Sequence, residues 1–200
     1  MIEVRKTDAF ARWLDNLPDI QVRARVQARI ERLVAGNPGD VEPVGEGVSE
    51  LRIDYGPGYR VYFKKRGRAW VVLLAGGDKN TQSKDIIKSL APGTKPFGVA
   101  TMGKTATTRY DVAEHLRTPE EMAAYLEACL EEAPGDAAFI AKALGDIARA
   151  KGMAQVARDA GLSRESLYKA LSGERSPGFD TILKVIGALG LKLHAEARKS

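Results

Sequence analysis

Hydrophobic positions along this chain follow two different periods. A short strand at residues 2–6 precedes two stretches with helical spacing, at residues 8–17 and 19–36. Apolar and polar residues then alternate in SELRIDY, YRVYFKK and RAWVVLLAG, which predicts three consecutive antiparallel strands. The last of these is almost entirely apolar, as is typical of a central strand buried on both faces. With a short helix beginning near Thr81, the first half is predicted to be an α+β domain of order β-α-α-β-β-β plus a short C-terminal helix.

The second half has a helical period almost throughout. It follows APGTKPFGVATMGKTATT, a stretch rich in Gly, Pro and Thr that has no apolar period. Helices are predicted at about 119–132 and 136–150, and MAQVARDAGLSRESLYKALSGERSP has the spacing of a helix-turn-helix. We therefore predict a first domain at 1–90, a linker at 91–108 and an all-α domain at 109–200, with a recognition helix at about 163–172. The linker segment GVATMGKT matches the P-loop pattern, but no strand precedes it and no helix follows it, so we assign no nucleotide site.

Charge is distributed unevenly along the chain. Residues 1–100 hold 17 Lys and Arg against 12 Asp and Glu, a balance of +5, and residues 111–136 hold one against eight, a balance of −7. Residues 137–200 return to +5, with 11 against six. This order suggests an acidic helix that covers a basic first domain, followed by a basic domain that binds nucleic acid. The alternative is an acidic helix that is merely solvated.

Other features narrow the class of protein. The N-terminal residues are charged where a signal peptide would be apolar, and the longest apolar run, 70–75, is too short to cross a bilayer. We expect a cytoplasmic protein with no membrane partner. The single cysteine, Cys129, lies among helix formers with no second thiol nearby, so we expect it in the core and predict no metal and no cofactor.

Two longer segments resemble known families. ELRIDYGPGYRVYF at 50–63 and LLAGGDKNTQSKDI at 73–86 resemble the RelE/ParE superfamily, specifically HigB-like addiction-module killer toxins. DVAEHLRTPEEMAAYLEACLEEA and FIAKALGDIARAKGMAQVARDAGLSRESLYKALS resemble a HigA-type, Xre-like helix-turn-helix antitoxin. The resemblance implies a type II toxin–antitoxin pair in one chain. The toxin half would be a metal-independent endoribonuclease acting on mRNA on the ribosome. The antitoxin half would neutralise it and repress operator DNA as a homodimer or larger assembly.

The chemistry of RNA cleavage selects candidate residues in the first half. Attack by a 2′-hydroxyl on the adjacent phosphate requires a proton acceptor, stabilisation of phosphate charge and a proton donor. Arg52 and Arg60, on neighbouring strands, would clamp one phosphate; Lys79 is a candidate proton donor or second cation, and Asp78 a candidate orienting group or base. Tyr62 completes the predicted catalytic set, and the predicted RNA-binding residues are Tyr55, Lys64 and Lys65.

The alternatives for these residues are surface charges and turn positions. A histidine acid or base is excluded from the first half, because the two histidines are His115 and His194. The chain also lacks a tyrosine after the last strand of the toxin half, where some RelE-like toxins carry a catalytic one, so the proton-transfer roles stay open.

Candidate DNA contacts lie on the predicted recognition helix. Ser163 begins it, and the candidates for base or phosphate contacts are Arg164, Ser166 and Lys169. Tyr168 and Arg175 are expected to contact the DNA backbone. The alternative is a helical hairpin that packs only against protein.

Two other functions remain open at this point. A ParE-like first half would inhibit DNA gyrase by binding it, without nuclease chemistry. The whole chain would otherwise be a DNA-binding transcriptional regulator with an inactive, toxin-like interaction module.

Overall fold

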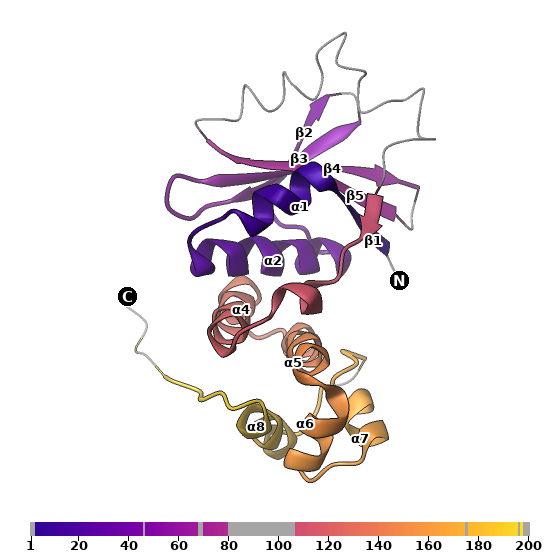
Figure 1. The fold of residues 1–200 in the computed structure, drawn as a ribbon, viewed down its shortest axis with the longest axis vertical. Coiled ribbons are helices and arrows are strands. Elements are labelled where there is room, and N and C mark those ends of the chain that lie inside the picture. Colours follow the sequence, from indigo (N-terminus) through magenta and orange to yellow (C-terminus); the bar gives the residue numbers. More distant parts are fainter. Residues whose placement is uncertain are drawn as a thin grey trace. The chain divides into compact units, whose positions relative to one another are not determined.

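The computed structural model describes residues 3–45, 47–67, 70–79, 107–174, 176–195 and 197. The chain forms two compact units, Met1–Asp111 and Val112–Ser200 (Figure 1). The helix predicted from Thr81 and most of the predicted linker lie outside the described residues.

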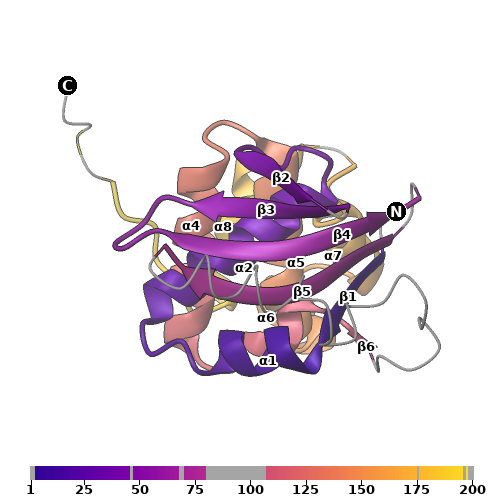
Figure 2. The same cartoon turned by 90° about the horizontal axis from the view of Figure 1, so that it is seen from above.

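The first unit is built on a mixed six-stranded sheet. Its described elements are β1 (Glu3–Thr7), α1 (Asp8–Asp15), α2 (Ile20–Val34), β2 (Val41–Gly45), β3 (Val48–Ile53), β4 (Tyr59–Arg66), β5 (Trp70–Asp78) and β6 (Thr107–Arg109). The strand order is β2-β3-β4-β5-β1-β6 (Figure 2). Among the described strands, β1 and β5 pair in parallel and all other neighbours are antiparallel.

Helices α1 and α2 cover one face of this sheet (Figure 1). Each begins at a side-chain cap: the Thr7 hydroxyl accepts from the Phe10 N–H, and the Asp19 carboxylate accepts from the Gln21 N–H. The apolar face of each helix and one face of the sheet are buried, as the two periods predict. The fully or almost fully buried residues include Phe10, Leu14, Val26, Ile30, Leu51, Val61, Phe63 and Leu73.

The structure adds two strands to the three-stranded meander that the pattern predicts. Strand β2 forms in the turn-rich stretch and contains Pro43, which an edge strand tolerates because its outer side needs no ladder hydrogen bond. Strand β6 lies partly in the predicted linker and occupies the opposite edge. The pattern predicts the second domain from residue 109, whereas the first unit extends to Asp111, because β6 pairs with β1.

Strand β5 has the central, buried position that its apolar composition predicts. It lies between β4 and β1 in the sheet, and four consecutive side chains, from Val71 to Leu74, are buried. A strand covered on both faces has no solvent-facing position that would favour a polar residue.

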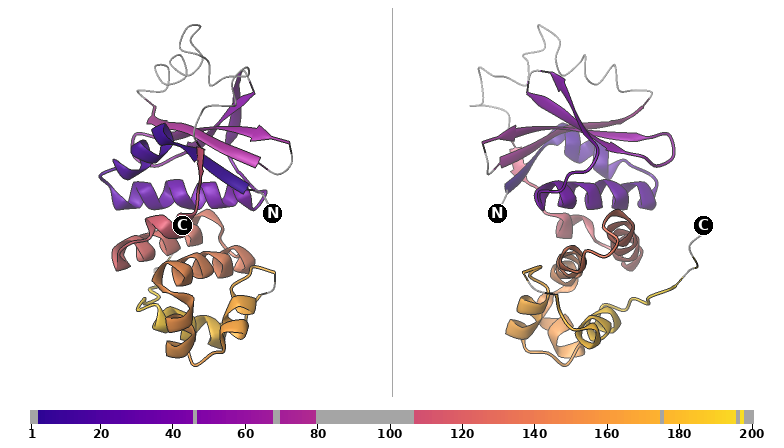
Figure 3. Two further views of the ribbon diagram at one scale, coloured as in Figure 1. Left: turned by 45° about the vertical axis from the view of Figure 1, so that its right-hand side comes forward. Right: turned by 180° about the vertical axis from the view of Figure 1, so that it is seen from behind.

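The second unit is helical (Figure 3). Its elements are the 3₁₀ helix η1 (Val112–His115) and the α-helices α4 (Pro119–Glu132), α5 (Ala137–Lys151), α6 (Met153–Asp159), α7 (Arg164–Ala170) and α8 (Phe179–Ala188). Residues 191–195, for which the sequence left a strand or a frayed end open, form neither helix nor strand. No helix among the described residues has both the length and the apolar character needed to cross a membrane.

A buried carboxylate connects α4 to α5. Asp146, on α5, is 4% exposed and accepts hydrogen bonds from the Tyr125 hydroxyl on α4 (3.1 Å), Lys142 Nζ (3.1 Å) and Arg149 (2.7 Å). The neighbouring Cys129 of α4 is also buried, as expected for core packing. These contacts compensate the cost of burying Asp146 and fix the two helices against each other.

Helices α6 and α7 are joined by a tight turn. Gly161 has φ +67°, a conformation that side chains with a Cβ rarely adopt, and the Leu162 N–H donates to Ala157 O at 2.9 Å. The Ser163 hydroxyl then accepts from the Ser166 N–H at 3.0 Å and begins α7. Leu167 is fully buried, which fixes the inner face of α7 and leaves its other positions outward.

Candidate functional site

The two arginines predicted to act together face each other across two strands. Arg52 of β3 pairs with Arg60 of β4, and Glu50 pairs with Tyr62 one step along the same ladder. Because successive strand residues alternate between faces, these four side chains lie on the sheet face opposite Leu51 and Val61. The sheet therefore brings both guanidinium groups to one place.

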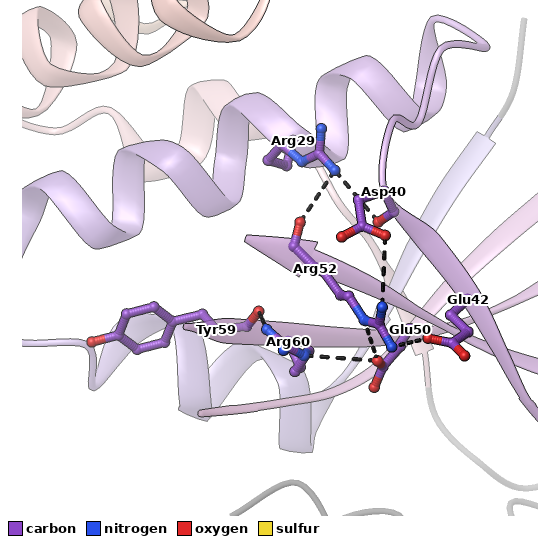
Figure 4. Close-up of polar contacts among 7 residues, drawn as sticks. All are labelled: Arg29, Asp40, Glu42, Glu50, Arg52, Tyr59 and Arg60. Carbon is purple, nitrogen blue, oxygen red and sulfur yellow. Dashed lines mark hydrogen bonds and ion pairs between the residues drawn. The ribbon is translucent and has the colours of Figure 1, made fainter. Parts of the chain in front are cut away.

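A buried carboxylate lies between these guanidinium groups (Figure 4). The Glu50 side chain is 1% exposed, and its Oε1 lies 2.7 Å from Arg52 Nε and 3.7 Å from Arg60 Nε. Arg52 also contacts the more exposed carboxylates of Glu42, on β2, and Asp40, the latter at 3.9 Å. Glu50 is thus the shared partner of both arginines, whereas Glu42 and Asp40 are paired with Arg52.

Helix α2 fixes the backbone beneath this site. The Arg29 guanidinium donates to Arg52 O at 3.1 Å and to Asp40 O at 3.5 Å (Figure 4). Arg29 is itself buried. These bonds position Asp40 and Arg52 from the helix side, so that the opposite face of β3 presents its side chains on a rigid support.

The formal charges of this group cancel, but one donor atom of Arg60 makes no hydrogen bond within the described part of the chain. The group holds three guanidinium groups and three carboxylates: Arg52 and Arg60 contact the carboxylates of Asp40, Glu42 and Glu50, whereas Arg29 donates to main-chain oxygens. Arg60 is 14% exposed and donates to Tyr59 O at 2.9 Å, yet its buried Nε makes no hydrogen bond among the described residues. Because this Nε is buried beside Glu50, an anionic oxygen can reach Arg60 only at the exposed part of its guanidinium.

Two further predicted residues lie at the same end of the sheet. Asp78, the last residue of β5, pairs with Tyr59, and the Lys79 N–H donates to Gly58 O at 2.9 Å. Gly58 is two residues from Arg60, so Lys79 and Asp78 follow the arginine pair at the edge where β4 begins. The Lys79 side chain is exposed and Asp78 is half-buried.

The remaining predicted residues are not available to RNA beside the arginine pair. Tyr62 is 2% exposed and lies in an apolar cluster with Val48 and Val72, so it has no free ring face for stacking on a base. Lys64 and Lys65 lie four and five residues beyond Arg60, about 13 to 17 Å along the strand.

Tyr55 is in the turn that joins β3 to β4. Its ring lies under the Arg25 guanidinium, with the guanidinium carbon 4.4 Å from the ring centroid. A base that stacked on this ring would compete with that cation–π contact.

Sequence reasoning missed the carboxylates of the site. The spacing of Glu50 and Arg52 in SELRID, two residues apart on a strand, places both on one face and was the available indication. Glu42 gave no such indication, because the strand that carries it was predicted as a turn. Asp40 and Arg29 are brought to the site only by tertiary contacts.

In the second unit, α7 presents a row of exposed polar side chains. Ser163, Arg164, Ser166 and Lys169 are exposed, and Tyr168 is 49% exposed. The Ser163 hydroxyl caps the helix and donates to the Ser166 hydroxyl at 2.8 Å, so it already has partners. Arg175, the remaining predicted contact, lies outside the described residues.

Comparison with known proteins gives a separate match for each half. The family model for "Phage derived protein Gp49-like" matches residues 12–89, and that for "Probable addiction module antidote protein" matches residues 106–197. Residues 90–105 fall between the two matches.

Two relatives are proteins of Haemophilus influenzae Rd, both described only as uncharacterized. One is 49% identical over 85 residues, which is 42% of this chain and 86% of the relative. The other is 53% identical over 87 residues, which is 44% of this chain and 88% of the relative. No solved structure matches the chain significantly.

Proposed function

Because this chain belongs to the toxin–antitoxin addiction modules, with a Gp49-like segment followed by an addiction module antidote segment, we propose that its first unit is an RNA-cleaving toxin. The second unit neutralises that toxin and represses its own operator. The observation that carries the nuclease proposal is the Arg52–Arg60 pair on neighbouring strands, with buried Glu50 between the two guanidinium groups.

In this proposal the arginine pair binds the phosphate to be cleaved. The 2′-oxygen loses its proton and attacks phosphorus, and the bond from phosphorus to the 5′-oxygen breaks, giving a 2′,3′-cyclic phosphate and a 5′-hydroxyl. Arg60 and Arg52 stabilise the charge that develops on the phosphate oxygens. Exposed Lys79 supplies a proton to the leaving oxygen, and Asp78 orients Lys79 or accepts the proton of the 2′-hydroxyl.

The carboxylates have different roles in this scheme. Glu50 is buried, so it does not touch RNA; it is a positioning residue that holds both guanidinium groups in register. The Glu42 side chain is 52% exposed and contacts Arg52 from β2. An incoming phosphate takes the place of Glu42 on Arg52 while Glu50 keeps its contact.

Growth and mRNA integrity test this proposal directly. We expect residues 1–98, expressed alone under tight induction, to arrest growth and cleave mRNA on ribosomes, whereas the full chain does neither. The variant R60A should lower cleavage at least about a hundredfold, as loss of one anion-stabilising donor does in other enzymes. R12A makes the same substitution at an exposed arginine of α1 that has no predicted role in RNA binding, and serves as the control.

Each alternative outcome has a definite meaning. Growth arrest with intact mRNA would point to a gyrase inhibitor and refute the nuclease. Absence of arrest would leave a DNA-binding regulator with an inactive first unit. Cleavage that survives R60A and R52A would refute the assigned site but not the activity.

For the second unit we propose a helix-turn-helix in which α7 enters the major groove. The tight turn at Gly161, the buried Leu167 and the outward Arg164, Ser166 and Lys169 support this assignment. Arg164 and Lys169 supply base or phosphate contacts. Because such proteins read two half-sites one helical turn apart, we propose a homodimer on a palindromic operator.

A gel-shift experiment with the DNA upstream of the gene tests this second role. K169A should weaken binding and lower the slope of log affinity against log salt by about one, as expected for one lost phosphate contact. K184A removes an exposed lysine from α8 and is the matched control. Equal loss with both variants would indicate only a general effect of charge.

A further inference from the structure

The short strand β6 belongs to one half of the chain by sequence and to the other by structure. Residues 106–197 match the antidote family, yet Thr107–Arg109 complete the edge of the first unit's sheet (Figure 2). The strand runs antiparallel to β1, with Arg5 opposite Arg109, Lys6 opposite Thr108 and Thr7 opposite Thr107. The beginning of the antidote segment is therefore built into the toxin-like unit.

Side chains as well as the backbone hold this strand. Arg5 Nε donates to the Thr107 hydroxyl at 2.8 Å, and the Arg5 guanidinium also donates to Thr107 O. One residue beyond β6, the Tyr110 N–H donates to Val4 O at 2.9 Å. The contacts thus continue from Thr107 to Tyr110, and their partners on β1 run from Val4 to Thr7.

Tyr110 anchors the end of the segment. It is 5% exposed, and its ring meets the Phe10 ring edge-on, with centroids 6.3 Å apart and planes at 75°. Lys6 Nζ lies 5.7 Å from the centroid of the same ring. A buried aromatic anchor beside a short strand is the combination by which an extended segment gains both affinity and specificity.

Without β6, the outer side of β1 would expose a row of backbone N–H and C=O groups. Such an edge pairs readily with any extended segment, because each new ladder bond satisfies two groups that otherwise need water. Strand β1 pairs with β5 on its other side and cannot pair there a second time.

We propose that the outer edge of β1 is the docking site for the antidote's N-terminal strand, residues 107–110, and that this strand addition holds the two halves together without the connecting chain. The proposal rests on the division into a toxin half and an antitoxin half, but not on nuclease activity. It identifies an interaction surface, the edge of β1 with the Phe10 ring, and its partner, an extended antidote segment with an aromatic residue at its end.

The test uses the full chain with a site-specific protease sequence inserted after Gly98, between the two family matches. After cleavage, one fragment is immobilised by a C-terminal tag and release of the other is followed over time. We expect the fragments of the wild-type sequence to stay associated.

Thr108 provides a matched pair of variants. Because the Tyr110 N–H points to β1 and strand residues alternate, the N–H of Thr108 points to the same side. T108P removes this donor and T108A keeps it, and the side chain is exposed in either case. We expect release to be at least about tenfold faster with T108P and unchanged with T108A.

A second variant tests the same docking without changing the backbone of the strand. Y110A leaves the backbone donor in place and removes only the ring that packs on Phe10, so it should also speed release about tenfold. Tryptophan fluorescence checks that the first unit stays folded.

Two results would overturn strand docking: release as slow in T108P and Y110A as in T108A, or immediate separation of the wild-type fragments. Neither readout depends on RNA cleavage, so failure here and failure of the nuclease proposal are distinguishable.

Discussion

Replacing Glu50 with glutamine should destabilise the first unit and leave the second unchanged. The substitution preserves the size of the side chain and removes its charge from a position that is 1% exposed. Glu50 is the carboxylate shared by Arg52 and Arg60, so its neutralisation weakens both pairs at once.

The contacts of the two arginines set the magnitude. Arg52 is 35% exposed and keeps Glu42 and Asp40, so its loss is that of a surface pair, below about 1 kcal/mol. Arg60 is 14% exposed, and Glu50 is its one ion-pair partner among the described residues. Removing one partner of a fully buried ion pair costs about 3 to 5 kcal/mol, and the cost is smaller here because the two groups are 3.7 Å apart and Arg60 is partly exposed. Together these give about 2 kcal/mol, or about a 1 M shift in the urea midpoint of a small unit.

Tryptophan fluorescence isolates the unit in question. The chain has two tryptophans, Trp13 and Trp70, and both belong to the first unit. Urea unfolding of the full chain, followed at these residues, therefore reports on Glu50 without separating the units. The control is E42Q, the same chemical change on a half-exposed partner of Arg52, which should shift stability by less than about 0.5 kcal/mol.

A double-mutant cycle measures the coupling between Glu50 and Arg60. E50Q combined with R60M should show a coupling free energy of about 1 to 2 kcal/mol, since residues in one ion-pair network are not additive. If E50Q and E42Q shift the midpoint equally, or if E50Q and R60M add independently, Glu50 does not hold Arg60 and the proposed positioning role fails.

Two further predictions concern the second unit. G145A should destabilise it by about 1 to 3 kcal/mol, because a Cβ there would lie 2.9 Å from the backbone oxygen of Leu171. G187A has open space around the new Cβ and should stabilise α8 by up to about 1 kcal/mol. Circular dichroism melts of both variants measure these changes, and equal effects would contradict the prediction. Hydrogen bonds from its own backbone N–H and from the Thr118 hydroxyl lower the pKa of Glu120, so this group stabilises α4 above its ordinary pKa and loses that effect as pH falls through the lowered value. The melting difference between wild type and E120Q should therefore be largest near neutral pH and shrink as the solution is acidified below the ordinary pKa of glutamate; a difference that grew on acidification would refute this.

Local pattern was sufficient for most individual elements. The spacing of apolar residues predicted α2, α4 and α5, because an amphipathic helix is defined by residues close in sequence. The four apolar residues from Val71 to Leu74 predicted a central strand for the same kind of reason. The alternation in SELRIDY and YRVYFKK placed Arg52 and Arg60 on strands, and their pairing is now a structural fact.

What only the tertiary structure decided concerns partners far apart in the sequence. Tyr62 has an aromatic ring of the kind that stacks on RNA bases, but an apolar cluster from three strands buries it. Glu50 became the centre of the site because folding removes it from water and places it between Arg52 and Arg60. Strand β6 is too short and polar to show a period, and it exists because the β1 edge, about 100 residues earlier, has backbone groups to satisfy. Sequence fixes which local conformations are favourable, whereas long-range pairing and burial decide which charges meet.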